Sequence, residues 1–341
     1  MAKSVKLADI AERLKVSKVT VSKALSGQKG VSEEMREKIV KLADEMGYKQ
    51  PSAREKEKIV KSYNIGVLIA EGYLDKYDSF YWQMYQQVAL KAVEKESFTL
   101  MEVVTIAMER EKELPKLLHE QKVDGIIVIG RLSDTYLDFL NRVGKVPFVY
   151  LDFVDKKQEI DAVISDSYYG AYHITNYLFD MGHKKIAYVG TLLATGSITD
   201  RYFGYVRSML EHGENVREDY LIEDRDKETG KIDAKQFFAL PTDMPTAFVC
   251  NCDLTASYLI KNLEEAGYRV PEDISVVGYD NYLFPGLCDV PITTYEVDMK
   301  EMAKRALDMI IKKISGQRYR GGICIVEGHL VEKDSVKKIK N

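Results

Sequence analysis

The sequence predicts an all-α helix-turn-helix headpiece followed by an α/β body of two similar lobes with parallel sheets. Two observations carry this prediction. Apolar residues recur every three to four positions through the first 48 residues, and from residue 63 onward Val/Ile-rich runs alternate with helical stretches. Residues 1–62 also hold 15 Lys and Arg against 9 Asp and Glu, whereas the remainder holds 34 against 44. A basic head on an acidic body is typical of a nucleic-acid-binding module joined to one that does not bind nucleic acid.

Two short helices are expected to open the headpiece. The first has an apolar stripe made of Leu7, Ile10, Ala11 and Leu14. Ser17 can cap the second helix by accepting its free N–H groups. The inward face of that helix carries Thr20, Val21 and Ala24, and its outward face carries Lys18, Val19, Ser22 and Lys23. A cationic and hydroxylic outward face is the surface that a recognition helix needs in the DNA major groove.

A third helix is expected between Ser32, as its N-cap, and Gly47. Three short helices with facing apolar stripes can bury one small core. A plain three-helix capping module would show the same spacing, so the spacing alone leaves both interpretations open.

Residues 6–48, KLADIAERLKVSKVTVSKALSGQKGVSEEMREKIVKLADEMGY, resemble the headpiece of the lactose-repressor (LacI) family of bacterial transcription regulators. The resemblance implies base reading by Lys18, Val19 and Lys23, because lysine can donate to guanine and valine can touch a thymine methyl group. Thr20 is also expected to take part in DNA binding, although it lies on the inward face of this helix. The resemblance also implies phosphate contacts, which set register, for Ser17, Ser22, Ser32 and Tyr48. Lys15 stands where the family usually has glycine, and a left-handed lysine there costs about 1 kcal/mol.

The segment 50–62 is expected to be a mobile linker, because it is rich in charge and poor in apolar residues. Members of the family fold this hinge on DNA and insert a leucine into the minor groove. Here Ala53 and Arg54 resemble the hinge pattern and can still reach that groove. Glu55, Lys56 and Glu57 stand where the leucine would be, so apolar intercalation is not expected.

The body has two sets of strand candidates: 65–70, 100–106, 125–130, 148–152 and 162–166, then 185–190, 247–251 and 274–280. Continuous apolar strands between helices favour parallel sheets covered on both faces. A nucleotide enzyme would show the same alternation, but its motifs are missing. No GxGxxG follows the first strand, GTLLATGS at 190–197 lacks the spacing and the lysine of a phosphate loop, and neither GxSxG nor HExxH occurs.

The resemblance to the LacI family continues through the body, in DSYYG (166–170), MGHKKIAYVG (181–190), DRYFGY (200–205), PTAFVCNCD (245–253), VPEDISVVGYD (270–280) and PITT (291–294). It implies a periplasmic-binding-protein-like (type I) core whose two lobes close on a small polar ligand. Arg201 and Asp253 match family positions that hydrogen-bond the ligand, and their donors and acceptors suit vicinal hydroxyls.

Four further residues complete the expected effector site. Phe80 and Tyr81 align with the aromatic pair that opens the first helix of the first lobe, and Tyr169 and Asp280 lie near other ligand positions. Each has a structural alternative. Phe80 can be a core residue and Asp253 a helix cap, while Asp166 and Asp280, which end strands, are more often caps than ligand contacts.

No metal or cofactor is expected. Cys250 and Cys252 could share one face of a strand, but no CxxC motif or neighbouring histidine supports a metal site, and the cysteines are interpreted as reduced thiols. The N-terminus lacks a signal-peptide core and no apolar run is long enough to cross a membrane, so the expected compartment is the cytoplasm.

The sequence therefore predicts a transcription regulator, not an enzyme, that binds a pseudo-palindromic operator as a homodimer. Its ligand is expected to be a sugar or glycoside, although purines and other small polar molecules stay open. The rival interpretations are a sugar-transport receptor and a nucleotide enzyme.

The expected domains are a headpiece at 1–49, a hinge at 50–62 and a core at 63–341. Its first lobe is placed at about 63–182 and 292–325, and its second at about 183–291 and 326–341. The C-terminus has no heptads, so no tail-mediated tetramer is expected.

Overall fold

The computed structural model describes residues 5–26, 28–48, 62–74, 79–157, 160–227 and 230–339. The chain forms two compact units, residues 1–61 and residues 62–341. The predicted hinge contacts, Ala53 and Arg54, lie outside the described residues.

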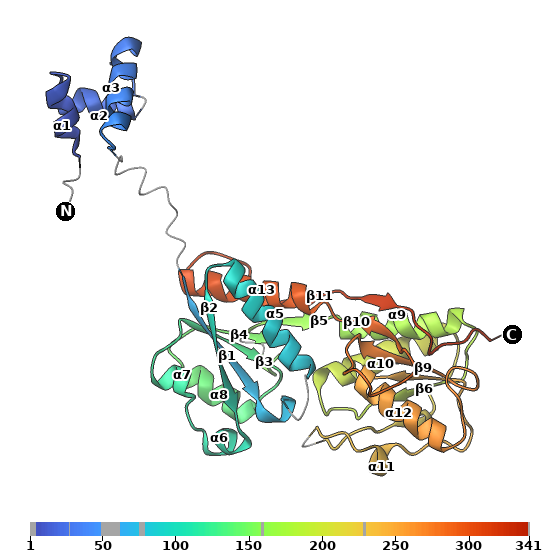
Figure 1. Ribbon diagram of the computed structural model, residues 1–341. Coiled ribbons are helices and arrows are strands. Elements are labelled where there is room, and N and C mark those ends of the chain that lie inside the picture. Colours follow the sequence, from blue (N-terminus) through green and yellow to red (C-terminus); the bar gives the residue numbers. More distant parts are fainter. Residues whose placement is uncertain are drawn as a thin grey trace. The chain divides into compact units, whose positions relative to one another are not determined.

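The first unit is all-α in its described part (Figure 1). Its helices are α1 (Leu7–Arg13), α2 (Lys18–Leu25) and α3 (Glu33–Glu45). They share one small core made of Ile10, Ala11, Val21, Ala24, Ile39 and Ala43. Ser17 caps α2 as expected, because its Oγ accepts the Thr20 N–H at 3.1 Å. Lys15 has a φ of 53°, so the turn between α1 and α2 does hold a lysine in the left-handed conformation.

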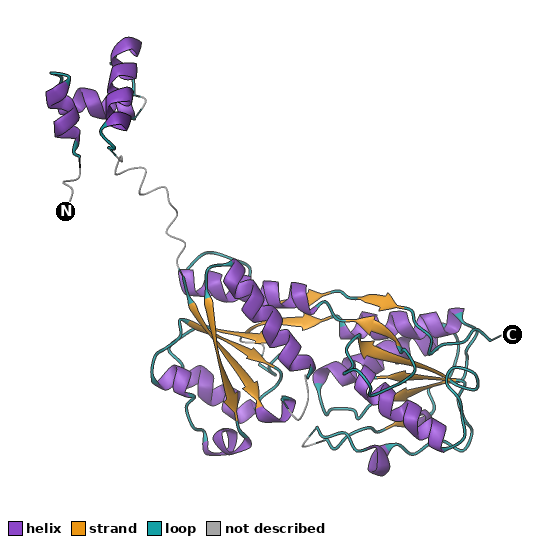
Figure 2. Ribbon diagram, viewed as in Figure 1, coloured by secondary structure: helices purple, strands orange, loops and turns teal. Residues whose placement is uncertain are grey.

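The first lobe of the second unit is built on an all-parallel sheet of order β11-β5-β4-β3-β1-β2 (Figure 2). Its strands are β1 (Asn64–Ala70), β2 (Phe98–Val104), β3 (Gly125–Ile129), β4 (Phe148–Leu151), β5 (Asp161–Ser165) and β11 (Ile323–Val326). Its helices are η1 (Glu71–Tyr73), α5 (Phe80–Glu94), α6 (Ile106–Glu111), α7 (Lys116–His119), α8 (Asp134–Val143) and α13 (Met299–Ser315).

The second lobe has a sheet of order β12-β10-β9-β8-β6-β7, parallel except for the β10–β12 pair. Its strands are β6 (Ile186–Val189), β7 (Leu221–Ile222), β8 (Ala247–Cys250), β9 (Ser275–Asp280), β10 (Thr293–Glu296) and β12 (His329–Val331). Its helices are α9 (Ser167–Asp180), α10 (Gly196–Glu211), η2 (Glu218–Tyr220), α11 (Ala234–Phe237) and α12 (Asp253–Glu265). These two lobes and the helical headpiece confirm the predicted fold class.

The chain passes between the lobes at β5–α9, at β10–α13 and at β11–β12. Two predicted lobe boundaries need correction. The first crossing lies near residue 166 and not at 182, because α9 packs on α10 in the second lobe. A Cβ on Gly204 of α10 would lie 2.1 Å from the Tyr168 carbonyl oxygen, so the two helices meet backbone to backbone. The second crossing follows residue 296 and not 291, because β10 pairs with β9. The third crossing follows Val326, the last residue of β11.

Each of the eight predicted strands is present, whereas β7, β10, β11 and β12 were not predicted. These four are short, and most of the residues of β11 and β12 remain partly exposed, so they lack the continuous apolar run of a central strand. Within the described residues, none of the helices combines the length and apolar character needed to span a membrane.

Candidate nucleic-acid interface and ligand site

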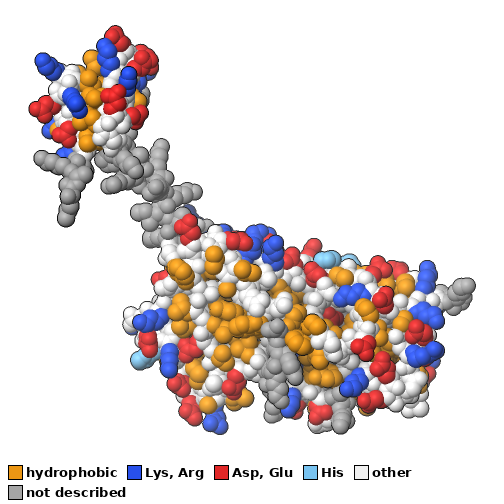
Figure 3. All heavy atoms as spheres, in the orientation of Figure 1, with side chains coloured by type: hydrophobic (Ala, Val, Ile, Leu, Met, Phe, Trp, Pro, Cys, Tyr) orange, Lys and Arg blue, Asp and Glu red, His pale blue; other side chains and the backbone are white. Residues whose placement is uncertain are grey.

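The exposed side of α2 carries the side chains expected to read bases. Val21 and Ala24 are buried in the headpiece core, while Lys18 and Val19 face solvent, Val19 with 62% of its surface exposed. Lys23 lies at the edge of this surface and is half-buried. An exposed valine beside two lysines is costly in water but can contact a thymine methyl group. Figure 3 shows Lys and Arg side chains interspersed with Asp and Glu on this headpiece.

The residues expected to contact phosphates differ in whether their hydroxyl groups are exposed and whether they already form hydrogen bonds within the headpiece. Ser22 and Ser32 are exposed, and Ser32 is the N-cap residue of α3 without a capping side-chain bond. The Ser17 hydroxyl is engaged at the start of α2, 2.8 Å from the hydroxyl of Thr20. Thr20 is half-buried, so it supports the cap of the helix more directly than it supports the outward surface. Tyr48 is half-buried against the headpiece core.

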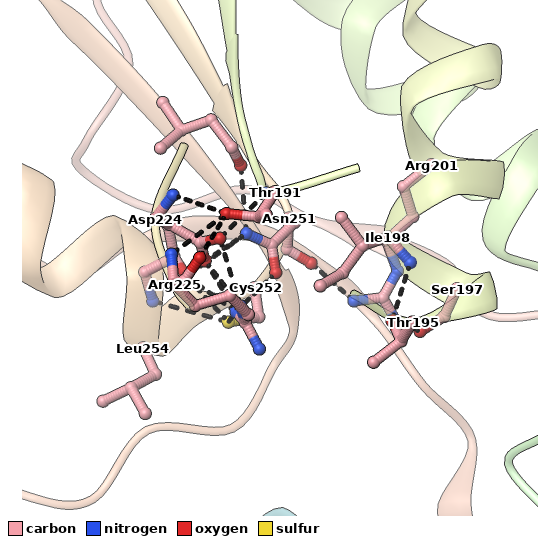
Figure 4. Close-up of polar contacts among 12 residues, drawn as sticks. Thr191, Thr195, Ser197, Ile198, Arg201, Asp224, Arg225, Asn251, Cys252 and Leu254 are labelled. Atoms are coloured by element: carbon pink, nitrogen blue, oxygen red, sulfur yellow. Dashed lines mark hydrogen bonds and ion pairs between the residues drawn. The ribbon is translucent and has the colours of Figure 1, made fainter. Parts of the chain in front are cut away.

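Arg201 anchors a polar cluster in the second lobe. It lies on α10 with only 6% of its surface exposed, and Figure 4 shows its guanidinium directed toward the end of β8. Nη1 donates to the Asn251 carbonyl oxygen at 2.5 Å and Nη2 to the Asp280 carboxylate at 3.2 Å. The guanidinium lies 3.7 Å from the centre of the Tyr279 ring. Nε is buried without a hydrogen-bond partner among the described atoms, which leaves one donor free for a ligand.

Two carboxyl groups from opposite lobes act on this arginine. Asp280 ends β9 of the second lobe, and burial raises its pKa to about 6 although Arg201 opposes the shift. Asp152 follows β4 of the first lobe, and burial, opposed by Arg201 and reinforced by Asp280, raises its pKa to about 7. Tyr81 donates a hydrogen bond to Asp152. Because each of these groups affects the pKa of another across the two lobes, they belong to one site. The sequence analysis did not identify Asp152 as part of it.

A second arginine, also missed from the sequence, lies beside this cluster on the loop after β7 (Figure 4). Arg225 donates through Nε and Nη2 to Asp224, which is fully buried, and Nη2 also donates to the Asn251 side chain at 2.9 Å. Burial acts to raise the pKa of Asp224, but Arg225 and the hydrogen bonds from Thr255 and Asn251 hold it below its usual range. The network fixes Arg225 without making the site cationic, because Asp224 balances its charge.

Asp253, predicted to contact the ligand, is buried, and its Oδ1 has no hydrogen-bond partner among the described atoms. Its surface is 2% exposed, its Oδ2 accepts the Tyr282 N–H at 2.9 Å, and burial raises its pKa well above its usual range. The adjacent Cys252 is the N-cap of α12. Asp253 therefore supports the turn after β9 and is not the cap residue itself. Gly278 makes room for it, because a Cβ there would lie 2.0 Å from the Asp253 Oδ1.

The predicted aromatic residues separate into two groups. The Phe80 ring lies 5.3 Å from that of Tyr81 and 6.3 Å from that of Tyr282 in the other lobe, so this pair does border the space between the lobes. Tyr169 does not belong to this group. The residue is 48% exposed, its ring centre lies 5.6 Å from the Arg207 guanidinium, and it lines a separate pocket of about 590 Å³ that shares no residue with the Arg201 cluster. Asp166 caps α9, as the structural alternative proposed.

The cysteines are unpaired, and Cys250 is buried. Within the described ranges, His, Cys, Asp and Glu side chains do not gather in groups of three or more that could hold a metal ion.

Comparisons with known proteins assign both parts of the chain. Residues 6–51 match the family model "Bacterial regulatory proteins, lacI family", and residues 175–336 match "Periplasmic binding protein-like domain". The HTH-type transcriptional repressor PurR of Vibrio vulnificus is 28% identical over 97% of this chain and 98% of its own length. PurR of Photobacterium profundum is 26% identical over the same shares.

Solved structures show the same fold. A transcriptional regulator CelR–cellobiose complex has a TM-score of 0.68 at 20% identity, covering 97% of this chain and 99% of that one. The lac repressor dimer bound to operator and the anti-inducer ONPF has a TM-score of 0.65 at 23% identity, covering 98% and 100%.

Proposed function

The chain belongs to the LacI family of bacterial regulatory proteins. We propose that it is a transcriptional repressor whose affinity for operator DNA is controlled by a small neutral ligand bound between its lobes. The observation that carries the DNA-binding part is the face of α2, where Lys18, Val19 and Ser22 are exposed while Val21 and Ala24 form the core. Such a face can enter a major groove without disturbing the packing of the headpiece.

Base discrimination is assigned to Lys18, Val19 and Lys23, and phosphate contacts to Ser17, Ser22, Ser32 and Tyr48. Ala53 and Arg54 are proposed to approach the adjacent minor groove without an apolar wedge. A gel-shift titration over a range of salt concentrations tests this part. One duplex selected from a random pool should bind with a steep negative salt dependence. A sugar-transport receptor or a nucleotide enzyme would select no duplex.

The charges of the ligand site favour a neutral, hydroxyl-rich molecule. Asp224 balances Arg225, Asp280 pairs with Arg201, and Asp152 adds one more carboxyl group. The site therefore has no excess of positive charge and offers both donors and acceptors, which suits hydroxyl groups and disfavours an anion. The aromatic pair Phe80 and Tyr81 can cover the apolar face of a sugar ring. A sugar or glycoside is thus the proposed effector.

A nucleobase is the second candidate, because the same aromatic residues can stack on a planar ring. A thermal-shift screen of neutral sugars, glycosides and purines on the full chain separates the two. A rise in unfolding temperature with purines alone would reject the sugar, and a rise with sugar phosphates alone would reject a neutral ligand.

Control requires only that the ligand prefer one arrangement of the lobes by a few kcal/mol. Asp152 and Tyr81 come from one lobe and Arg201 and Asp280 from the other, so a molecule bound to both favours the closed arrangement.

A homodimer is proposed, because two headpieces are needed to read a pseudo-palindrome. Exposed apolar side chains at one edge of the first lobe, Leu90, Val93 and Phe98, are available for pairing, and Figure 3 shows hydrophobic side chains exposed on the body. Sedimentation of the full chain should give twice the monomer mass. A cytoplasmic location follows from the access to DNA that this function requires.

A further inference from the structure

Arg36 is not among the residues proposed to contact DNA, but it forms hydrogen bonds with the recognition helix α2. It lies on α3, yet its guanidinium reaches back to the end of α2. Nη1 donates to the Ala24 carbonyl oxygen at 2.8 Å and lies 3.4 Å from the Lys23 carbonyl oxygen, while Nη2 donates to the Gln28 carbonyl oxygen at 2.8 Å. One planar fork thus holds the last turn of α2 and the loop that follows it.

The end of α2 needs such a partner. The last carbonyl groups of a helix accept no hydrogen bond from an N–H group within the helix, and they carry its partial negative charge. Here Ser26 returns its N–H and its hydroxyl to the Ser22 carbonyl oxygen, and the Gln28 N–H reaches that of Lys23 at 3.0 Å. The Ala24 carbonyl oxygen receives the Arg36 guanidinium.

Because α2 is short, the contacts at its C-terminal end help to set the orientation of the whole helix. It has eight residues, and Lys23 is part of its last turn. A shift of that turn moves the Lys23 side chain relative to Lys18 and Val19 at the other end. Sequence discrimination depends on these side chains meeting base edges together, whereas attraction to phosphates tolerates small displacements.

We propose that Arg36 is a positioning residue that fixes the recognition helix through the carbonyl groups of Ala24 and Gln28, and thereby sets sequence discrimination without touching DNA. This inference rests on the proposed DNA-binding function. A lysine cannot replace the fork, because a single ammonium group cannot span the two carbonyl groups with the same planar geometry.

The test compares Arg36→Met, Arg36→Lys and Lys38→Met in the full chain. Lys38 lies on the same helix, is exposed and pairs only with Glu34 in the described structure, so its variant controls for the loss of one positive charge. For each protein, gel shifts measure affinity for the duplex selected by the wild type and for random duplex over a range of salt. Amide exchange of residues 18–28 reports whether α2 is still folded.

Arg36→Met should lose about tenfold to a hundredfold in affinity for the selected duplex and less than about threefold for random duplex, with an unchanged salt slope. Arg36→Lys should fall between Arg36→Met and the wild type, and Lys38→Met should keep the wild-type ratio. Equal losses on both duplexes with a shallower salt slope would identify Arg36 as a phosphate contact and overturn the proposal. So would an unchanged ratio in Arg36→Met, or loss of amide protection throughout α2. If the wild type selects no duplex at all, the proposed function itself fails.

Discussion

Replacing Asp152 by asparagine should stabilise the body of the protein at neutral and alkaline pH. Burial raises the pKa of Asp152 to about 7, so the folded state binds a proton that the unfolded chain has already released. For an acid whose pKa rises on folding, the stabilising contribution is complete below the unfolded value near 4 and is lost as the pH rises through the folded value. Asparagine has the shape of the protonated acid and can still accept the Tyr81 hydrogen bond.

The size of the effect follows from the pKa values. Between about pH 5 and about pH 8, a carboxyl group with a folded pKa near 7 loses roughly 2.5 kcal/mol of folding free energy. Asp280, with a pKa raised by burial to about 6, loses roughly 1.4 kcal/mol over the same range. The variant should therefore keep only the smaller dependence, and the excess of its unfolding temperature over that of the wild type should grow by roughly 5 °C between about pH 5 and about pH 8.

Thermal unfolding of ligand-free protein, followed by circular dichroism at several pH values, measures the difference between the two curves. Asp138→Asn is the matched control, because it removes a carboxyl group whose side chain is 45% exposed. If Asp152→Asn keeps the wild-type slope with pH, or if Asp138→Asn flattens the slope equally, Asp152 does not titrate as a buried group of the cleft and the reasoning is refuted.

Three further predictions concern base reading by the headpiece, ligand binding by Arg201, and the packing of Gly278 against Asp253. Lys23→Ala should weaken binding to the selected duplex by about 1–3 kcal/mol and change binding to random duplex little; equal losses would contradict base reading. Arg201→Ala should abolish the thermal shift caused by the effector while operator binding persists, and a normal response in this variant would remove Arg201 from the ligand site. Gly278→Ala should lower the unfolding temperature strongly, because its Cβ would collide with the Asp253 carboxylate, whereas Gly196→Ala, whose Cβ meets nothing within 4 Å, should not.

Local rules were sufficient for the helix faces of the headpiece. The period of 3.6 residues separates Val21 and Ala24, which are buried, from Lys18 and Val19, which are exposed. The left-handed conformation of Lys15 did not follow from such rules, because its cost for a lysine argued for a different turn. The fork of Arg36 could not be predicted either, because a contact between α3 and the end of α2 depends on how the helices pack and not on either helix alone.

In the body, local sequence rules do not predict the role of each candidate site residue. Arg201 was predicted through its motif, but an aspartate at the end of a strand can cap a helix, support a turn or face a cleft. Asp166 caps α9, Asp253 accepts the Tyr282 N–H in the turn after β9, and Asp280 pairs with Arg201 and is proposed to face the cleft. The sequence gives no sign of the difference, because it arises from which neighbours the second lobe brings to each carboxyl group. Tyr169 was misplaced for the same reason: its helix crosses into the second lobe earlier than the sequence suggested.

The backbone around the cleft gives independent support for the assignment of Asp152 and Asp280. Asp280 ends β9 and Asp152 follows β4, so both lie at the carboxyl ends of central parallel strands, where ligands of open α/β sheets bind. Both also have positive φ, 70° for Asp152 and 102° for Asp280, a conformation that costs a non-glycine residue about 1 kcal/mol or more. Glycine would remove that strain at either position but would also remove the carboxylate. An aspartate on each lobe, both influencing the pKa of Arg201, is the arrangement on which the proposed ligand site rests.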